Sequence, residues 1–383
     1  MKIGLFTNAY HPTINGVVSA VSLLYRGMKE LGHSVYIFAP GFKGYSDDGP
    51  DIYRFWSVNP LPKNKFPLAI PFHPGLIGMI TRMNLDIIHT HHPFLLGKLG
   101  AKLARRLKIP LIYTFHTQFE RYVHYVPLLP EKLATRITRS LIIKYLRNCD
   151  TVLCPSPTVL PLLEDYGVTS EVEVIPNPVD LSSFGNADGK PVREKYGISR
   201  DEKLLIYVGR LGKEKSLPEL FRAFKEIQET YPSSKLMIVG EGPYKEPLEE
   251  DIKNLELDKK IILTGRVEPG EIPPYYAAAD IYVMTSTSEV KPLALLEAMA
   301  SGLPVIAVKG PGATDTITNG EDGILVDGPE DDFVSAVINF LNNPELTKKM
   351  GNNARANSRK YNYLNIAEKT IRAYNKAMLK IDN

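Results

Sequence analysis

Short apolar runs alternate with longer segments of helical periodicity along the first 180 residues. Residues 18–31 have helical spacing and are closed by Gly32. Because buried parallel strands are β-branched and almost continuously apolar, we expect five of them in this part of the chain. They are KIGLF, SVYIFA, IIHT, LIYTFH and TVLCPS. This alternation predicts a doubly wound α/β domain.

A proline-rich passage, Val174 to Phe184, interrupts this pattern. It can continue neither a helix nor a central strand, so we expect a linker there. The alternation then restarts with six strand-like runs: KLLIYVG, KLMIVG, KIILTG, IYVMTS, PVIAV and ILV. We therefore expect two Rossmann-like domains, residues 1–178 and 179–362, with a helix in 363–383 that crosses back to the first. Ligands of such folds bind at the carboxyl ends of the strands, here in a cleft between the two sheets.

Length and charge agree with this division. A chain of 383 residues with 44% hydrophobic content is typical of two globular domains. The net charge of +3 gives no reason to expect nucleic acid as a partner. Residues 1–180 hold 19 Lys and Arg against 13 Asp and Glu, whereas the remainder holds 27 against 30. The basic first half favours an anionic surface or ligand on that side.

Neither the cysteines nor the apolar segments indicate secretion or a membrane span. Cys149 and Cys154 are the two cysteines, which suits a reducing compartment. The opening MKIGLFTNAY is typical of a strand and not of a signal peptide. The longest apolar candidate, residues 66–80, is interrupted by prolines and lacks the ~20 uninterrupted apolar residues of a membrane helix. We expect a cytoplasmic protein.

Two glutamates lie on either side of a predicted helix start. The strand-like IYVM ends before Thr285 and the helix pattern begins near Pro292, so Glu289 is expected in the loop and Glu297 in the helix. A helix N-terminus offers unpaired N–H groups and a positive dipole end that suit a phosphate. Carboxylates accept hydrogen bonds from sugar hydroxyls, so the pattern favours a sugar nucleotide. The alternative is a solvated loop carboxylate and a helix-surface carboxylate.

Two cations follow another predicted strand end. Arg210 and Lys215 come directly after the strand that ends at Gly209. The planar guanidinium and the compact ammonium suit a departing diphosphate, where negative charge develops. The alternative is an ordinary basic loop in which Glu214 and Glu219 pair locally.

The first strand is followed by a glycine-containing turn and a helix. The Asn15-Gly16 pair allows the backbone to approach a ligand closely. The dinucleotide fingerprint GxGxxG is absent, and so is the D-x-D triplet typical of metal-dependent sugar-nucleotide sites. We therefore expect neither a metal nor another cofactor, with Arg210, Lys215 and the helix end in the metal's place.

Histidines are concentrated in residues 89–97 and 113–125, each time after a predicted strand. Their spacings fit no zinc pattern. Polar contacts to a sugar are the functional interpretation, and capping or packing is the alternative.

A basic amphipathic helix is predicted within residues 127–148. Its apolar positions are Leu133, Ile137, Leu141 and Tyr145. The other faces carry Lys132, Arg136, Arg139, Lys144 and Arg147. Such a helix can lie on an anionic membrane surface. Packing on its own domain is the alternative.

The chain resembles the glycosyltransferase family 4 enzymes of GT-B fold over essentially its whole length. The motifs that carry the resemblance are VGRLGKEK, VIPNPVD, GEGP, ILTGRV, YYAAADIYVMTSTSE and EVKPLALLEAMASGLPVIA. TFHTQFERYVHY is similar to the acceptor-side motif of bacterial diacylglycerol glucosyltransferases.

The resemblance implies a retaining, metal-independent transfer of a hexose, glucose from UDP-glucose, to diacylglycerol or a related lipid. It implies peripheral association with the inner face of the cell membrane through the basic helix 131–147. The alternatives are a phosphoinositide or soluble acceptor within the same family, and a sugar-nucleotide epimerase of the same architecture.

The resemblance also implies roles for particular residues. Glu289 would hold donor-sugar hydroxyls and Glu297 the ribose, while Arg210 and Lys215 would stabilise the diphosphate. Catalysis would involve His116 over the transferred sugar together with Arg210, Lys215 and Glu289, with no nucleophile named. Further donor contacts would come from Gly16, Arg266, Val267, Lys291 and Leu293. The acceptor side would include His91, Glu120, Tyr122 and His124.

The segment after Glu289 departs from the glycine-containing sequence that is common in the family. Pro292 stands there and has no N–H for a phosphate. The neighbouring Lys291 adds a cation that would compensate.

Overall fold

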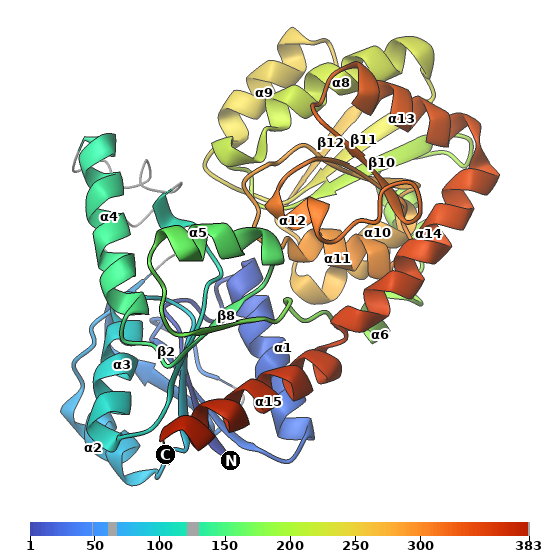
Figure 1. Ribbon diagram of the computed structural model, residues 1–383. Coiled ribbons are helices and arrows are strands. Elements are labelled where there is room, and N and C mark those ends of the chain that lie inside the picture. The colour runs from blue at the N-terminus through green and yellow to red at the C-terminus, as the bar shows by residue number, and fades with distance from the viewer. Residues whose placement is uncertain (48, 60–66, 121–129, 382–383) are drawn as a thin grey trace. The chain divides into compact units, whose positions relative to one another are not determined.

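The chain folds into two compact units (Figure 1). The computed structural model describes residues 1–47, 49–59, 67–120 and 130–381. The first unit comprises Met1–Pro178 with Tyr363–Asn383, and the second comprises Val179–Asn362. Within the described residues, no helix has both the length and the apolarity that crossing a bilayer requires.

The first unit is built on a parallel sheet of seven strands in the order β3-β2-β1-β6-β7-β8-β9. Five of these are the predicted runs: β1 (Lys2–Phe6), β2 (Ser34–Pro40), β6 (Ile87–Thr90), β7 (Leu111–Thr114) and β8 (Thr151–Cys154). The edge strands β3 (Ile52–Phe55) and β9 (Glu171–Val174) were not predicted. They read IYRF and EVEV and are largely half-exposed, so they lack the continuous apolar pattern of buried strands. A separate antiparallel pair joins β4 (Ser57–Val58) to β5 (Leu68–Ala69).

Six helices of the first unit are described. They are α1 (Gly16–Glu30), α2 (Pro74–Arg82), α3 (Leu96–Leu107), α4 (Glu131–Leu146), α5 (Leu160–Asp165) and α15 (Tyr363–Ile381). Helix α1 begins two residues before the predicted start, because the Asn15 side chain accepts a hydrogen bond from the Val18 N–H at 2.9 Å and caps it.

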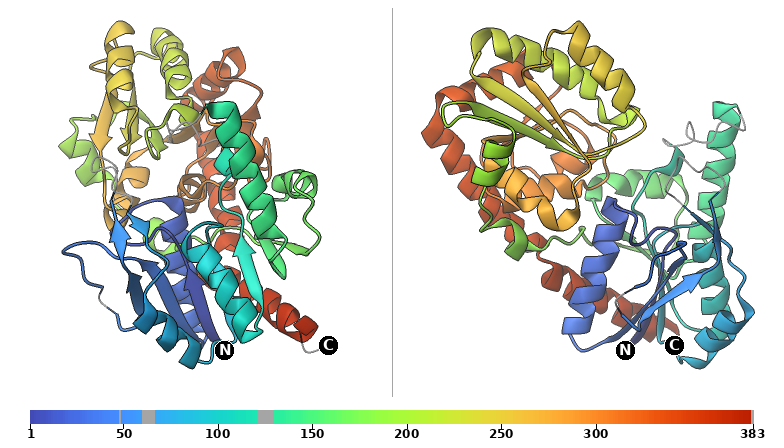
Figure 2. Two further views of the ribbon diagram at one scale, coloured as in Figure 1. Left: turned by 90° about the vertical axis from the view of Figure 1, so that its left-hand side faces the viewer. Right: turned by 180° about the vertical axis from the view of Figure 1, so that it is seen from behind.

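Helix α15 belongs to the first unit and lies along α1 (Figure 2). The two helices approach closely at Gly27, where an added Cβ would lie 2.8 Å from the Cβ of Ala367. Tyr374 on α15 places its hydroxyl 2.6 Å from Nδ1 of His89 in β6. The last helix is therefore part of the first unit's core.

The second unit is built on a parallel sheet of six strands in the order β12-β11-β10-β13-β14-β15. All six predicted runs form strands: β10 (Lys203–Val208), β11 (Ser234–Val239), β12 (Ile261–Gly265), β13 (Ile281–Met284), β14 (Val305–Val308) and β15 (Gly323–Val326). Alternate residues of β10 belong to two hydrophobic clusters, Leu204 and Ile206 to one and Leu205 and Tyr207 to the other. Both faces of the sheet are thus covered, which explains the continuous apolar runs.

The first helix of the second unit lies within the passage that was predicted to be a linker. They are α6 (Leu181–Phe184), α7 (Lys190–Lys195), α8 (Leu217–Thr230), α9 (Lys245–Asn254), α10 (Pro273–Ala278), α11 (Leu293–Ala300), α12 (Pro311–Thr314), α13 (Asp331–Asn342) and α14 (Pro344–Ser358). Asp180 caps α6 through the Ser182 N–H, and Phe184 is buried in the core. The expectation of a linker up to Phe184 was therefore wrong, because this apolar side chain folds into the second unit.

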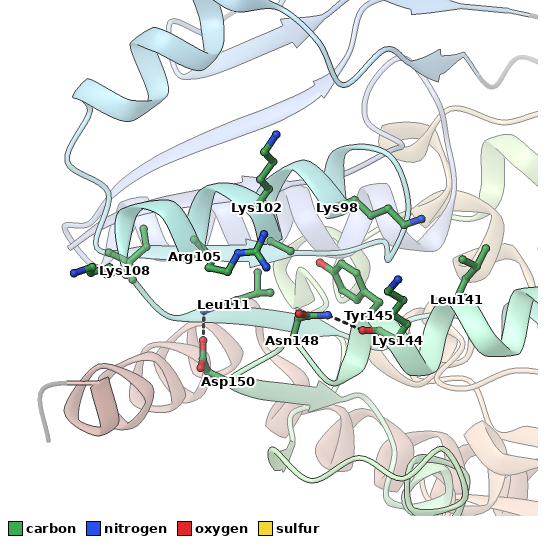
Figure 3. A pocket seen from close by; sticks show the side chains of 13 residues that line it. Lys98, Lys102, Arg105, Lys108, Leu111, Leu141, Lys144, Tyr145, Asn148 and Asp150 are labelled. Carbon is green, nitrogen blue, oxygen red and sulfur yellow. Dashed lines mark hydrogen bonds between the residues drawn. The ribbon is translucent and has the colours of Figure 1, made fainter.

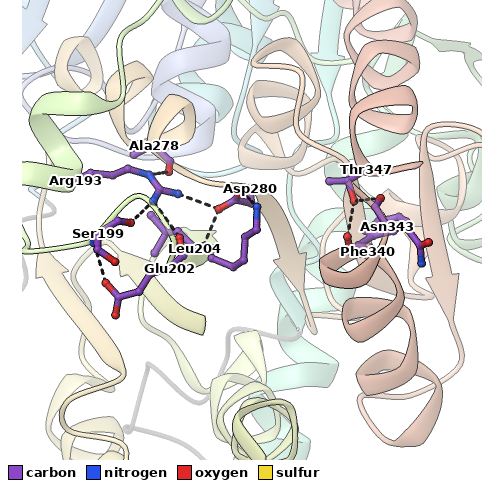
Figure 4. Close-up of polar contacts among 10 residues, drawn as sticks. Arg193, Ser199, Glu202, Leu204, Ala278, Asp280, Phe340, Asn343 and Thr347 are labelled. Carbon is purple, nitrogen blue, oxygen red and sulfur yellow. Dashed lines mark hydrogen bonds and ion pairs between the residues drawn. The ribbon is translucent and has the colours of Figure 1, made fainter. Parts of the chain in front are cut away.

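An ionic network holds β10 to β13 at the amino ends of the two strands (Figure 4). Asp280, which directly precedes β13, accepts hydrogen bonds from Arg193 at 2.9 Å and from the Leu204 N–H at 2.8 Å. Its other oxygen lies 3.3 Å from Nζ of Lys203. Arg193 also donates to the backbone carbonyls of Ala278, Ser199 and Glu202. The network fixes the two central strands at the end opposite to their carboxyl-terminal loops.

We expect Asp280→Ala to destabilise the second unit locally by about 1–3 kcal/mol, because two cations and one N–H lose their acceptor while staying partly shielded from water. Hydrogen exchange of β10 and β13, followed by mass spectrometry, should accelerate correspondingly. The matched control is Glu219→Ala, which breaks an exposed pair with Arg222 and should change exchange little. Equal exchange in both variants would contradict the role given to Asp280.

Candidate functional site

The sheet of the second unit has its topological switch point between β10 and β13. From β10 the chain continues to β11 on one side, and β13 continues to β14 on the other. Ligands of open α/β sheets bind at the carboxyl ends of the strands at such a point. The two loops that begin there are hydrogen-bonded together. Thr285 Oγ1 donates to the Ser216 carbonyl at 2.8 Å, and the hydroxyls of Ser286 and Ser288 donate to the Glu214 carbonyl at 3.2 and 3.1 Å.

These loops bring the predicted residues Lys215 and Glu289 into direct contact. The Lys215 ammonium donates a hydrogen bond to Glu289 Oε1 and forms an ion pair with it. The Lys215 side chain is 9% exposed, whereas that of Glu289 is 25% exposed. A nearly buried ammonium and a more accessible carboxylate thus lie together at the switch point. The two residues are 74 positions apart in sequence.

Arg210 has a local partner. Its guanidinium donates to Glu214 Oε1 at 2.5 Å, as the loop interpretation predicted. The other expected local pair, which involves Glu219, is formed with Arg222 on α8. Arg210 itself stays 36% exposed at the same edge of the sheet as Lys215. The local-pairing interpretation is therefore confirmed for Arg210, and the diphosphate role of the two cations stays a prediction.

The N-terminus of α11 lies in the continuation of the Glu289 loop. Pro292 precedes the helix and no side chain caps it, so the N–H groups of its first turn have no intrahelical partner. The predicted donor contact Leu293 is the first residue of this helix and is buried. The Gly312 N–H donates to the Glu289 carbonyl at 2.9 Å, and a Cβ on Gly312 would lie 2.5 Å from Pro292 Cδ. Close packing of α12 therefore fixes the loop, and glycine is required there.

The surroundings of Glu297 raise the pKa of its carboxyl toward neutral pH. It is the fifth residue of α11, and burial raises the pKa of its carboxyl to about 7. The Tyr276 hydroxyl lies 2.9 Å from Glu297 Oε2 and 3.0 Å from the Ala294 carbonyl, and donates its single proton to one of them at a time. The alternative of a solvated helix-surface carboxylate is not met, because Glu297 is half-buried and lies within hydrogen-bond distance of Tyr276.

The other predicted donor contacts have separate surroundings. Lys291 is buried, lies 3.2 Å from Asp315 and sits over the ring of Tyr361. Burial lowers the pKa of its ammonium. Arg266 is exposed and pairs with Glu268 at 3.0 Å. Val267 is a core residue. The contacts of Lys291 indicate support of the loop, and its role as a donor contact stays a prediction.

In the first unit, two predicted histidines meet at the carboxyl ends of β6 and β7. His91 Nδ1 lies 3.0 Å from His116 Nε2, and the two rings are stacked. Burial lowers the pKa of His116 to about 3 and that of His91 well below its ordinary value. Both imidazoles are therefore neutral at physiological pH. They can exchange hydrogen bonds with hydroxyl groups but carry no positive charge.

The neighbouring histidines have packing roles. His89 bonds Tyr374 and Thr114, and His92 accepts the Asn8 N–H at 3.1 Å. The packing alternative is thus correct for these two. In the part of the chain that the structure describes, no three His, Cys, Asp or Glu side chains are arranged to hold a metal ion.

The remaining candidates are Gly16, Glu120, Tyr122 and His124. Gly16 is the exposed first residue of α1. Glu120 Oε1 lies 4.0 Å from the Arg139 guanidinium. Tyr122 and His124 lie outside the described residues.

Sequence reasoning missed three supporting residues. Tyr276 and Asp315 hold Glu297 and Lys291, and Asn8 accepts the Leu96 N–H at the start of α3. Asn8 lies two residues after the end of β1, and a polar side chain just beyond a strand end is a usable signal. Tyr276 and Asp315 gave no signal, because their partners are set by packing between elements far apart in sequence.

Comparison with known proteins identifies the family. Residues 189–357 match the model "Glycosyl transferases group 1", and residues 14–183 match "Glycosyltransferase Family 4". The chain is 36% identical over 352 residues to an alpha-monoglucosyldiacylglycerol synthase of Streptococcus pneumoniae, covering 89% of this chain and 78% of that protein. It is 32% identical over 373 residues to the protein of the same name in Acholeplasma laidlawii, covering 94% and 93%.

A solved structure shows the same fold. Sucrose-phosphate synthase of Thermosynechococcus elongatus superposes with a TM-score of 0.82 at 22% identity, over 99% of each chain. The predicted fold of two Rossmann-like GT-B domains is confirmed. The chain belongs to glycosyltransferase family 4.

Proposed function

We propose that this glycosyltransferase moves glucose from UDP-glucose to diacylglycerol or a closely related membrane lipid. Two relatives above 30% identity, of which this chain covers 78% and 93%, are named alpha-monoglucosyldiacylglycerol synthases. The observation that carries the proposal is the Lys215–Glu289 pair at the switch point of the second unit. It combines a cation for a leaving diphosphate with a carboxylate for sugar hydroxyls.

The proposed configuration of the product is the same as that of the donor. The names of the two relatives specify an alpha-linked glucosyl product. Glucose in UDP-glucose is also alpha-linked, so an alpha product means retention. We include metal independence in the proposal, with cations and the helix end taking the charge-neutralising role of a metal.

The candidate site residues of the second unit then divide the binding of the donor among them. Lys215 and Arg210 stabilise the negative charge that develops on the departing diphosphate. The free N–H groups and the positive dipole end of α11 bind a phosphate oxygen. Glu289 accepts hydrogen bonds from the transferred sugar, and Glu297 accepts them from the ribose.

The first unit would supply the acceptor side. His91 and His116 are neutral, so they would position a lipid hydroxyl or a sugar hydroxyl by hydrogen bonding. Gly16, Glu120, Tyr122 and His124 would complete the donor and acceptor contacts as the family resemblance implies.

Helix α4 supports contact with an anionic membrane surface. Three of its predicted apolar positions are exposed: Leu133 by 44%, Ile137 by 42% and Leu141 by 36%. Only Tyr145 of that row is buried, and the helix packs on its unit through Ala134, Ile142, Tyr145 and Leu146. Exposed apolar side chains among basic ones favour peripheral binding at the inner face of the cell membrane.

Other acceptors are the second candidate within the family. Relatives at 26–27% identity include an N-acetyl-alpha-D-glucosaminyl L-malate synthase and a D-inositol 3-phosphate glycosyltransferase. The epimerase alternative gains no support from the relatives described here, which are named as transferases and synthases.

Replacing Lys215 should test the diphosphate role. We expect Lys215→Gln to lower kcat by about 10²–10³-fold, because one preorganised charge opposite the leaving group is lost. Glucosyl transfer from radiolabelled UDP-glucose measures this. The matched control is Lys213→Gln, which removes the same charge from an exposed position in the same 3₁₀ turn. Comparable losses in both variants would contradict a specific role for Lys215.

The pKa of Glu297 generates a pH prediction. Because its carboxyl has a pKa of about 7, it is mostly ionised at pH 8 and mostly protonated at pH 6. Ribose hydroxyls bind the ionised form better, so the Kd of UDP-glucose should rise about tenfold between pH 8 and pH 6. Calorimetric titration measures it, and UDP-glucose itself has no group that titrates in this range. Glu297→Gln should flatten the profile. An unchanged slope in that variant would exclude Glu297 as its source.

The product itself tests the proposed reaction. Diacylglycerol vesicles are incubated with the protein and a panel of UDP- and GDP-sugars, and the lipid extract is analysed by mass spectrometry. We expect a hexosyl-diacylglycerol with UDP-glucose, whose anomeric proton coupling in NMR reports an alpha linkage. Release of UDP without any glycolipid would overturn the lipid acceptor and favour a soluble one.

A further inference from the structure

Two buried lysines distinguish the loop that carries Glu289 from the rest of the described chain. A charged side chain usually stays in water, as the exposed lysines of α3 and α4 in Figure 3 do. Within the ranges that the structure describes, Lys215 and Lys291 are the only lysines that are buried. Lys215 pairs with the Glu289 carboxylate, and Lys291 follows Glu289 by two residues. Both buried charges therefore act on this one loop.

Lys291 is paired with a carboxylate that is buried as well. Its ammonium lies 3.2 Å from Asp315 Oδ1, and the two side chains are 2% and 6% exposed. It also lies 5.0 Å from the centroid of the Tyr361 ring, whose face attracts a cation. Burial lowers the pKa of the ammonium, and Asp315 opposes that shift. Asp315 thus offsets the cost of removing this charge from water.

The helix that precedes Asp315 also holds the backbone of the loop. The Gly312 N–H in α12 donates to the Glu289 carbonyl at 2.9 Å. An added Cβ on Gly312 would lie 3.0 Å from the carbonyl oxygens of Glu289 and Val290, so the contact is close. The segment from Glu289 to Lys291 is therefore fixed twice from the same side, by its backbone at one end and by an ion pair at the other.

The burial of Lys291 separates it from a ligand that enters from solvent. Its ammonium could reach a phosphate only by leaving Asp315, which would strand a buried carboxylate without its counter-charge. The Glu289 side chain, in contrast, is 25% exposed. The buried pair can therefore act on a ligand only through the position of Glu289.

We propose that Lys291 and Asp315 are positioning residues of the transfer site, which hold the Glu289 carboxylate in place without touching the donor. The inference rests on the proposed function in the role that it gives to Glu289. A displacement of about 1 Å in a reacting group can lower a rate by about 10²-fold. Breaking the pair should therefore lower kcat much more than it weakens binding of the nucleotide.

A double-mutant cycle tests the pair in the full chain. The variants are Lys291→Met, Asp315→Leu and the two combined. Each single change strands one buried charge, whereas an apolar pair often replaces a buried ion pair without loss. We expect kcat for glucosyl transfer to fall about tenfold or more in each single variant and the combined variant to recover most of that loss. The Kd of UDP, titrated calorimetrically, should change by less than about threefold throughout.

The opposite pattern would show that Lys291 itself contacts the diphosphate. The combined variant would then be as impaired as Lys291→Met, and UDP would bind about tenfold more weakly in both. The matched control is the exposed pair of Lys309 and Asp327, which lie 2.8 Å apart. Lys309→Met combined with Asp327→Leu should leave kcat within about twofold of the unmodified chain. An equal loss in this control would overturn a specific role for the buried pair.

A measurement without substrates separates this inference from the proposed reaction. The Gly312 N–H reports the position of Glu289 directly, because it donates to the Glu289 carbonyl. Its hydrogen exchange should accelerate in Asp315→Leu and slow again in the combined variant. Unchanged exchange in Asp315→Leu would overturn the positioning role, whatever the reaction is. The expected exchange pattern in a chain that transfers no sugar would instead count against the proposed function.

A second variant covers the case in which Asp315→Leu does not fold. Asp315→Asn removes the charge with little change in shape, and circular dichroism verifies its folding. We expect the same faster exchange at Gly312 and the same fall in kcat, since the buried ammonium again loses its carboxylate. Wild-type values for both quantities in Asp315→Asn would overturn the inference.

Discussion

The ion pair between Lys215 and Glu289 is the interaction on which the second unit's site depends. Removing an ammonium from water costs several kcal/mol unless a carboxylate compensates it. Glu289 therefore allows Lys215 to lie almost buried at the carboxyl edge of the sheet. The pair forms only because β10 and β13 are neighbours, which Asp280 secures at their amino ends, and because Thr285, Ser286 and Ser288 join the two loops at the other end.

The sequence allowed the central strands to be predicted but not the edges of the first sheet. All six strands of the second unit are covered on both faces, so each reads as an apolar run. Glu171–Val174 alternates charged and apolar residues because an edge strand is half-exposed. The proline-rich passage was assigned too far, to Phe184, since a four-residue helix capped by Asp180 has no periodicity of its own.

For the site, the sequence revealed the residues whose position follows from a strand end. Glu289 and Lys215 were expected at carboxyl ends of strands, and the parallel sheet brought them together. What pattern could not reveal is the partner of each group. Asp315 engages Lys291, and Tyr276 approaches Glu297, through packing of elements that are distant in sequence. The apolar row of α4 shows the same limit, because periodicity predicts a face and not what covers it.

The pairing of both cations at the switch point of the second unit has a chemical consequence. Arg210 and Lys215 are both matched by carboxylates, so the edge that would bind a diphosphate is close to neutral. In the proposed reaction, an entering diphosphate would have to share these cations with Glu214 and Glu289, which would restrain ground-state binding. Charge that develops later on a leaving diphosphate meets the same cations already in place and needs no further reorganisation. In the proposed reaction, a paired site of this kind would therefore favour the transition state over the bound donor.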